Sequence, residues 1–266
     1  MLNRRVKQLF WEKEALGLDI DSPDAVAVHA AMLRAKPCLK AIYRRWYQTL
    51  LRCLPLDGSG PVLEIGTGGG FLKSVMPGLI TSDIQSGPNT ELVCNGCTLP
   101  FKPDLLRAIV LLNTFHHLPD VPQFLAEAAR CLKPGGVILM IEPWTTAWSQ
   151  MVYRFLHHEP FDKKREAWRL TKGGPLSQSN SALPWIVFKR DVERFEAKYP
   201  TLRLIGLAPH MPFSYLLCGG FSVRSLLSEA QMGYVFRLEK IVARWMPQLA
   251  MFATIVVSRT ADERHI

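Results

Sequence analysis

The sequence predicts an α/β fold, a doubly wound sheet of seven strands with helices on both faces. Short apolar runs alternate with helical patterns between residues 54 and 142, which is typical of parallel strands joined by helices. Two further apolar runs follow residue 200, with a helical pattern between them. The chain has 266 residues, 48% of them hydrophobic and 21% charged, so it can bury a substantial core and is not disordered.

Each predicted strand is an apolar run that ends in a turn, a glycine or a polar residue. The predicted strands are residues 61–65, 79–83, 91–94, 107–112, 137–141, 202–207 and 249–258. Apolar residues at helical spacing predict helices over residues 71–76, 121–132, 144–158, 192–199 and 221–245. The sequence Lys133-Pro-Gly-Gly136 ends the second of these helices, because proline and glycine terminate helices.

The charge distribution bears on the partners of the protein. The chain carries 32 basic and 23 acidic side chains, a net charge of +9, yet residues 61–142 carry five basic and seven acidic ones. The positive excess lies outside this middle segment and favours an anionic substrate, an acidic membrane surface or nucleic acid. The basic residues are not interleaved with stacking aromatic residues as in nucleic-acid modules, so we expect no nucleic-acid partner.

The termini and the cysteines predict a cytoplasmic location. The first 17 residues are charged throughout, and the longest apolar run, 249–257, is far shorter than the roughly 20 residues of a membrane helix. The six cysteines are too few and too scattered for a disulfide scaffold. Cys94 and Cys97 form a single CxxC without a second pair or a nearby histidine, so we expect no metal site.

A glycine cluster follows the first predicted strand. The strand runs into Gly66-Thr-Gly-Gly-Gly70, and Asp83 ends the second strand, 19 residues after Glu64. Ligands of open α/β sheets bind beyond the carboxyl ends of the strands, and glycines let them approach the backbone. An acid about 20 residues downstream can accept both hydroxyls of a ribose. Each signal alone also fits an ordinary turn, but together they predict a nucleoside of the adenosine type.

Five segments in this region carry a family resemblance. VLEIGTGGG, ITSDI, CNGCTLPF, LLNTFHHLPD and LKPGGVILMIEP resemble the successive motifs of class I S-adenosylmethionine-dependent methyltransferases, in particular the small-molecule, methyltransferase type 11 branch. The resemblance covers residues 54–142 and implies a Rossmann-like fold with S-adenosylmethionine as cofactor. Gly66, Gly68 and Gly70 match GxGxG rather than the GxGxxG of nicotinamide-dependent dehydrogenases. The slightly acidic middle segment suits a sulfonium cation.

The resemblance also implies which residues bind the cofactor. They lie at the carboxyl ends of the predicted strands: Glu64, Gly66, Thr67, Gly68, Gly70, Asp83, Ile84, Asn95, Gly96, Cys97 and Asn113. The glycines and Thr67 line the methionine portion, Glu64 orients the loop, and Asp83 holds the ribose hydroxyls. Ile84 packs on the adenine, residues 95–97 reach its polar edge, and Asn113 faces the methionine ammonium. Two departures stand out: Asn95 replaces the usual Asp, and Leu106-Arg107 replaces the usual Phe-Asp.

Candidate catalytic residues are histidines after the fourth and fifth strands, together with one acid. Methyl transfer requires a positioned nucleophile, exclusion of water and, for a hydroxyl or amine, loss of a proton. His116 and His117 follow the fourth strand and either face the methyl group or support their loop. His157, His158 and Glu159 close the next helix. They either form an oriented base or are histidines favoured at a helix C-terminus. We expect the catalytic residues to be His117, His157, His158 and Glu159.

We predict one domain over residues 1–266, divided into six segments. Residues 1–48 form an N-terminal helical lid, 49–142 form the cofactor-binding core, and 191–208 and 247–259 complete the sheet. Residues 143–190 and 209–246 are insertions that cap the substrate. The first helix places Leu2, Val6 and Leu9 at helical spacing beside Arg4 and Arg5, so it either covers the cofactor or lies on an anionic membrane.

The sequence therefore predicts methyl transfer to an oxygen, nitrogen or carbon atom of a small or medium-sized acceptor. The basic, aromatic-rich insertions favour an anionic or amphipathic acceptor, such as a glycoconjugate or a lipid-linked molecule. A third possibility is methylation of RNA or protein. The sequence Asn113-Thr-Phe-His116 lacks the Pro-Pro-Tyr of the adenine- and glutamine-amide-methylating branches, which argues against those two branches. The alternatives are a non-catalytic S-adenosylmethionine-binding module and a nicotinamide-dependent oxidoreductase. The sequence does not predict the oligomeric state.

Overall fold

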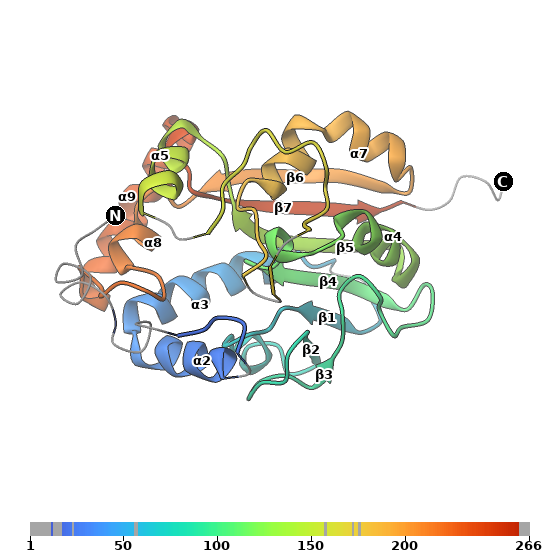
Figure 1. Ribbon diagram of the computed structural model, residues 1–266, viewed down its shortest axis with the longest axis horizontal. Helices are drawn as coiled ribbons and strands as arrows, with labels where there is room; N and C mark the ends of the chain where they lie inside the picture. The colour runs from blue at the N-terminus through green and yellow to red at the C-terminus, as the bar shows by residue number, and fades with distance from the viewer. Residues whose placement is uncertain are drawn as a thin grey trace.

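A mixed seven-stranded sheet forms the centre of the protein, in the order β3-β2-β1-β4-β5-β7-β6 (Figure 1). The computed structural model describes residues 12, 18–22, 24–55, 58–156, 159–171, 173–174 and 177–260. Strands β1 to β5 run parallel, whereas β7 is antiparallel to both β5 and β6. The strands are β1 Val62–Ile65, β2 Leu79–Asp83, β3 Leu92–Val93, β4 Leu106–Leu112, β5 Leu132–Pro143, β6 Leu202–His210 and β7 Phe252–Arg259.

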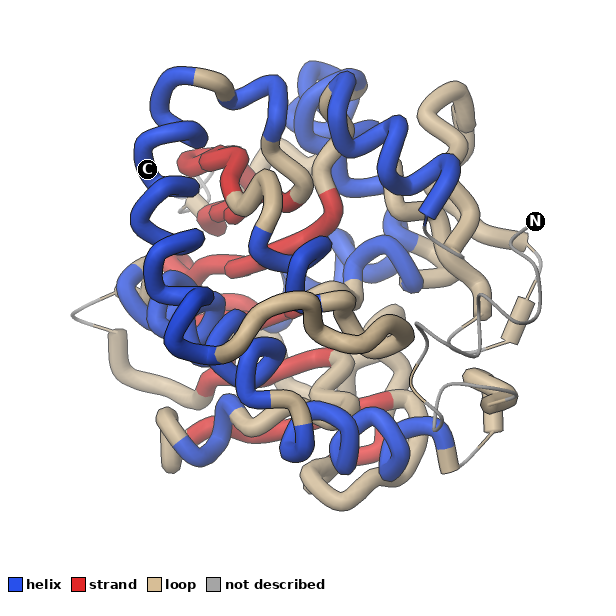
Figure 2. Tube along the Cα trace, turned by 90° about the vertical axis from the view of Figure 1, so that its left-hand side faces the viewer, coloured by secondary structure: helices blue, strands red, loops and turns tan. Residues whose placement is uncertain are grey.

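Helices cover both faces of this sheet, as Figure 2 shows from the left-hand side of Figure 1. One face packs against α3 (Pro37–Arg52), α5 (Ala147–Leu156), α8 (Ser214–Cys218) and α9 (Glu229–Trp245). The other packs against α4 (Val121–Cys131), α6 (Leu183–Trp185), the π-helical turn η4 (Ile186–Arg190) and α7 (Val192–Lys198). Successive residues point to opposite faces, so Ile109 belongs to one core and Val110 to the other. This double cover explains why β4 is almost wholly apolar.

The strand predictions agree with the structure, and the helix predictions agree in part. The helix expected over residues 71–76 is wrong: only the 3₁₀ turn η2, Leu72–Ser74, forms there. Pro77 explains this, because a residue that precedes proline is disfavoured in the helical region. The helix expected over residues 221–245 is α9, which begins at Glu229 behind a capping box formed by Ser228 and Gln231. The helical segment 183–190 was not predicted.

The two described helices that precede β1 occupy different positions, and the first predicted helix, with Leu2, Val6 and Leu9, lies outside the described residues. Helix α2 (Ala25–Ala35) lies beside the β1–β2 end of the sheet in Figure 1. Helix α3 continues to Arg52, across the boundary drawn at residue 48, and buries Leu39, Ile42 and Trp46 against the sheet. The described ranges include no helix with the length and apolarity needed to cross a bilayer.

Candidate active site

The glycine loop, residues 66–70, is held between the ends of β2 and β4. The backbone N–H groups of Gly66 and Thr67 both donate to the Ser82 carbonyl, at 2.9 and 3.0 Å. Gly66 has a φ of 75°, and a Cβ added there would lie 2.3 Å from Thr114 Oγ1. A side chain at position 66 would be strained and would clash, so this position requires glycine.

The first two described helices close over this loop. A Cβ on Gly69 would lie 2.5 Å from the backbone nitrogen of Ala30 in α2. A Cβ on Gly70 would lie 2.5 Å from the Tyr47 hydroxyl of α3, which accepts a hydrogen bond from Phe71 N at 3.0 Å. Gly69 and Gly70 therefore serve the packing of the N-terminal helices against the loop.

Two carboxylates flank the loop. Asp83, at the end of β2, accepts from Gly68 N at 2.8 Å and from Gln85 N at 3.2 Å. Glu64, in β1, is buried and accepts from the Thr67 hydroxyl at 3.1 Å. Burial raises the pKa of Glu64 to about 7, with the Thr67 hydrogen bond opposing this shift and the charge of Asp83 adding to it.

Asn113, directly after β4, has a buried side-chain oxygen that finds no hydrogen-bond donor among the residues that the structure describes. Its backbone has a φ of 52°, and its Oδ1 is buried without a hydrogen-bond partner. A buried acceptor without a donor is costly and calls for a ligand donor. Glu64 lies in β1, the strand that pairs with β4, and Asp83 ends β2 on the other side of β1. We call the glycine loop together with Glu64, Asp83 and Asn113, which are residues expected from the sequence to hold the cofactor, the cofactor crevice.

The residues expected to meet the adenine form a tight turn after β3. Asn95 Oδ1 accepts from Cys97 N at 2.9 Å, so two groups expected to reach the adenine pair with each other. Cys97 is buried, and its thiol donates to the Asp120 carbonyl at 3.4 Å. Gly96 packs against the core, since an added Cβ would lie 3.1 Å from Ile65. Ile84 is 44% exposed, which leaves an apolar surface for a ring to cover.

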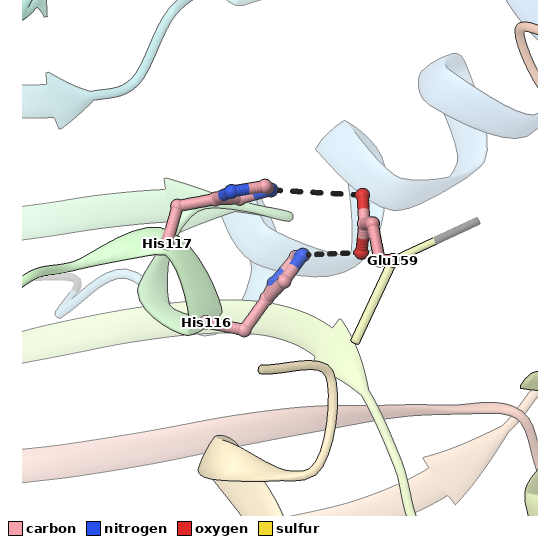
Figure 3. Close-up of side chains that lie close together, drawn as sticks. All are labelled: His116, His117 and Glu159. Atoms are coloured by element: carbon pink, nitrogen blue, oxygen red, sulfur yellow. Dashed lines mark ion pairs between the residues drawn. The ribbon is translucent and has the colours of Figure 1, made fainter. Parts of the chain in front are cut away.

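A second group of polar side chains gathers beyond the ends of β4 and β5, and we call it the His–Glu cluster: His116, His117, Glu142 and Glu159. The two histidines lie on the 3₁₀ turn η3, Phe115–His117, and face Glu159 from the same side (Figure 3). His116 Nε2 lies 3.2 Å from one Glu159 oxygen, and His117 Nε2 lies 3.7 Å from the other. His116 Nδ1 lies 2.6 Å from Glu142 Oε2.

Glu142 was missed by the sequence analysis, although it organises the cluster. Its other oxygen accepts from the backbone N–H groups of Thr114 and Phe115, at 2.7 and 2.8 Å, and the residue is fully buried. The available signal was a single acid at the carboxyl end of an otherwise apolar strand. Two polar groups from the insertion also join: the Gln178 carbonyl lies 3.2 Å from His117 Nδ1, and Ser181 donates to Glu159 at 3.0 Å.

The two neighbouring histidines differ in their pKa values. Burial alone would lower the pKa of His116, but Glu159 and Glu142 outweigh it and raise the pKa to about 10. Burial, and then the charge on His116, lower the pKa of His117 to about 4. His116 therefore carries a proton at neutral pH and His117 is neutral.

The predicted catalytic residues fall into two groups. His117 and Glu159 lie together, each about one fifth exposed, alongside His116. His157 and His158 lie outside the described residues.

A basic groove of about 410 Å³ adjoins the glycine loop. Its wall includes Gly69, Phe71 and Asn89, together with three cationic side chains from α2 and α3: Arg34, Lys40 and Arg44.

Comparison with protein families gives one match. The family described as "Methyltransferase domain" matches residues 63–140, which run from β1 to β5. A comparison with curated proteins found no match.

The chain is similar to several solved structures. A chain from the complex of the Haloferax volcanii Trm112 methyltransferase activator with a protein assigned as a methyltransferase is 16% identical. It has a TM-score of 0.53 over 91% of this chain and 97% of that chain. Geranyl diphosphate C-methyltransferase from Streptomyces coelicolor is 15% identical, with a TM-score of 0.47 over 94% and 89%. Phosphoethanolamine N-methyltransferase 2 from Haemonchus contortus is 11% identical, with a TM-score of 0.47 over 94% and 60%. The expected Rossmann-like α/β fold is confirmed.

Proposed function

Because residues 63–140 form a class I, S-adenosylmethionine-dependent methyltransferase domain, we propose that the protein transfers a methyl group from this cofactor to an oxygen, nitrogen or carbon atom of a small or medium-sized acceptor. The observation that carries this proposal is the cofactor crevice. The carboxylates of Glu64 and Asp83 accept hydrogen bonds from Thr67 and Gly68 of the glycine loop, whose first glycine cannot be replaced without a clash. Asn113, directly after the neighbouring strand β4, adds a buried oxygen without a hydrogen-bond partner among the described residues. Such a site favours a ligand that combines a cation with hydroxyl groups.

Each residue of the crevice is assigned to one part of the cofactor. The methionine ammonium would be held by Asn113 Oδ1 and by the Glu64 carboxylate. Each oxygen of Asp83 accepts one backbone N–H and keeps a lone pair for a ribose hydroxyl. Ile84 would pack on the adenine, and the Asn95 amide group and the Gly96 backbone remain proposed contacts of its polar edge.

When bound, S-adenosylmethionine supplies a methyl carbon whose bond to sulfur breaks as its bond to the acceptor forms, the electron pair staying on sulfur. An O–H or N–H acceptor must also lose a proton. We assign the promotion of this loss to His117 and Glu159, because His117 lies four residues beyond Asn113 after β4, Glu159 lies beside His117, and both side chains are partly exposed. His116 and Glu142 position them. His157 and His158 remain predictions.

An anionic acceptor is supported by the charge around the crevice. Arg34, Lys40 and Arg44 line the groove beside the glycine loop, whereas the crevice itself carries carboxylates. This separation of charge would draw an anionic group toward α2 and α3 while the cation of the cofactor stays in the crevice.

An amphipathic acceptor is supported by helix α9. Tyr234, Leu238, Ile241 and Trp245 are all more than half exposed, and their spacing places them on one face of the helix. The guanidinium of Arg244 lies 5.7 Å from the Trp245 ring, and that of Arg237 lies 5.9 Å from the Tyr234 ring. An apolar stripe bordered by cations is typical of helices that lie on anionic membranes, and we propose that α9 contacts such a membrane.

Vesicle binding tests the membrane contact. Ile241→Ser should weaken sedimentation with phosphatidylglycerol vesicles, and phosphatidylcholine vesicles should bind neither protein. Ile205→Ser is the matched control, because Ile205 is equally exposed but lies on β6. Equal binding of both variants to phosphatidylglycerol, at the level of the parent, would contradict the contact.

Calorimetry with S-adenosylmethionine tests the function. Asp83→Ala should lower the affinity about 100-fold, because two hydrogen bonds to a charged group are lost. Glu196→Gln, which alters an exposed carboxylate near Arg203, should bind like the parent. Unchanged affinity in Asp83→Ala would overturn the assignment of the crevice.

A turnover assay separates the alternatives. Release of S-adenosylhomocysteine with anionic and amphipathic acceptors would support the enzyme. Tight cofactor binding without turnover across acceptor classes would favour the non-catalytic binding module. Equal heats with a nicotinamide cofactor and with S-adenosylmethionine would favour the oxidoreductase.

A further inference from the structure

The hydrogen bonds of the two adjacent histidines determine which ring nitrogen each presents to Glu159. His117 Nδ1 faces the Gln178 carbonyl, which can only accept, so Nδ1 carries the proton. His116 Nδ1 faces the Glu142 carboxylate, whose second oxygen is fixed by two backbone N–H groups. Both rings are thereby oriented with Nε2 toward Glu159, as Figure 3 shows.

The three inward-facing groups have the spacing of a coordination shell. One donor atom each from His116, His117 and Glu159 can be chosen so that all three lie within 4.8 Å of one another. The two nitrogen–oxygen distances are 3.2 and 3.7 Å. Ligand atoms at about 2.1 Å from a tetrahedral zinc ion lie about 3.4 Å apart, so small side-chain movements would complete the shell.

The surrounding hydrogen bonds match those of metal-binding histidines. Such histidines donate their outer N–H to a carboxylate or a backbone carbonyl, which fixes the tautomer and the ring orientation. Glu142 and the Gln178 carbonyl are acceptors of these two kinds, and Ser181 donates to Glu159. In addition, two carboxylates lie on either side of the buried His116. A divalent cation that binds His116 Nε2 would displace the proton of this ring to solvent and would balance the charge of the two carboxylates in its place.

We propose that His116, His117 and Glu159 bind a divalent transition-metal ion, with Glu142 and Gln178 as the groups that orient the two histidines. Two imidazoles and one carboxylate suit Zn²⁺, Co²⁺ or Fe²⁺ rather than the oxygen-preferring Mg²⁺ and Ca²⁺. Three protein ligands leave a coordination position for an acceptor oxygen. The role of the metal ion rests on the proposed function: the ion would make an acceptor hydroxyl more acidic and so assist the loss of the hydroxyl proton.

Cobalt binding to the untagged full-length chain tests this site. The protein is stripped with a chelator and titrated with CoCl₂ alone, without cofactor or acceptor. We expect one saturating Co²⁺ per chain, with visible d–d absorption that ZnCl₂ abolishes by displacement. Failure to observe a saturable cobalt spectrum in the parent would overturn the proposal.

Variants assign the ligands. His117→Gln and Glu159→Gln, both at partly exposed positions, should each weaken Co²⁺ binding at least about 100-fold. Glu142→Gln should weaken it about 10- to 100-fold while keeping the spectrum, because it acts through His116. Glu196→Gln is the carboxylate control and should bind like the parent. Parent-like binding by a folded His117→Gln or Glu159→Gln variant would refute the assigned ligands, and circular dichroism identifies the folded variants.

The same samples keep this proposal distinct from the proposed function. Calorimetry with S-adenosylmethionine is run on the chelator-treated parent. Cofactor binding without cobalt binding would refute only the metal site, leaving a protonated hydrogen-bonded cluster in its place. Cobalt binding without cofactor binding would refute only the proposed function.

Discussion

The cofactor crevice and the His–Glu cluster lie at the same edge of the sheet but are built in different ways. The crevice comes from the carboxyl ends of β1 and β2 and from the turns after β1 and β4, and its glycine loop is held by hydrogen bonds to the Ser82 carbonyl near the end of the paired strand β2. The cluster joins the turn after β4 to the end of β5 and to residues 159, 178 and 181 of the insertion. Turn residues and the pairing of neighbouring strands specify the first, whereas the packing of a distant segment specifies the second.

Among the substitutions considered, removing the Glu142 side chain should cause the largest loss of stability. Glu142→Ala leaves the N–H groups of Thr114 and Phe115 without an acceptor and leaves His116 beside one carboxylate instead of two. We expect a loss of about 4 kcal/mol in the free energy of unfolding, measured by urea denaturation. Glu127→Ala, which removes a more exposed carboxylate bonded to Arg130, should cost less than about 2 kcal/mol. Equal losses would mean that the buried cluster is no more tightly specified than a surface pair.

Alanine substitutions at three glycines test whether the backbone geometry of the glycine loop is as strictly required as the structure indicates. Gly66→Ala combines a left-handed φ with a clash against Thr114 and should cost about 3 kcal/mol. Gly68→Ala has the left-handed φ but open space around it, and should cost about 1 kcal/mol. Gly78→Ala has neither and should stay within about 0.5 kcal/mol of the parent. Thermal unfolding ranks the three, and a different order would contradict the geometry of the loop.

The protonation of Glu64 should make the stability of the crevice depend on pH. Burial raises the pKa of Glu64 to about 7, so the folded chain holds this proton more tightly than the unfolded chain. The stabilisation is complete below about pH 4.5 and is lost as the pH rises to about 7. Between pH 5 and pH 8 the cofactor-free parent should lose about 2 kcal/mol more stability than Glu64→Gln. Urea denaturation at the two pH values measures this difference, and identical pH profiles would contradict it.

As the pH rises, the affinity for the cofactor should increase, whereas the stability of the cofactor-free protein should decrease. A bound ammonium favours the ionised carboxylate, so affinity for S-adenosylmethionine should rise from pH 5 to pH 8 in the parent. In Glu64→Gln this part of the increase should disappear.

The fold, and the position of the crevice residues at the ends of strands, could be predicted because their signals lie in short segments of sequence. An apolar run followed by glycine or acid marks the end of a strand, and parallel strands bring such ends together. Asp83 and Asn113 lie at strand ends for this reason. The helix expected over residues 71–76 failed because a single Pro77 outweighed the apolar pattern.

The cluster could be predicted only in part. Glu159 and the two adjacent histidines were named separately, but their meeting depends on how the insertion folds back onto η3, where the Asn180 backbone donates to the His116 carbonyl. In the sequence Glu142 resembles an ordinary strand residue, and only the structure reveals its three hydrogen bonds. Sequence spacing carries no information on such long-range contacts.

The smallest predicted effect separates binding from folding at Asn113. Its φ of 52° suits glycine, and its buried Oδ1 has no donor among the described residues. Asn113→Gly therefore removes a costly polar atom without straining the backbone, and stability should stay level or rise by up to about 1 kcal/mol. If that oxygen receives the methionine ammonium, affinity for S-adenosylmethionine should nevertheless fall about tenfold, equivalent to about 1.4 kcal/mol. Calorimetry and thermal unfolding of the same sample measure both quantities. A loss of stability with unchanged affinity would make Asn113 a structural residue of the β4 turn and would remove the ammonium contact from the crevice.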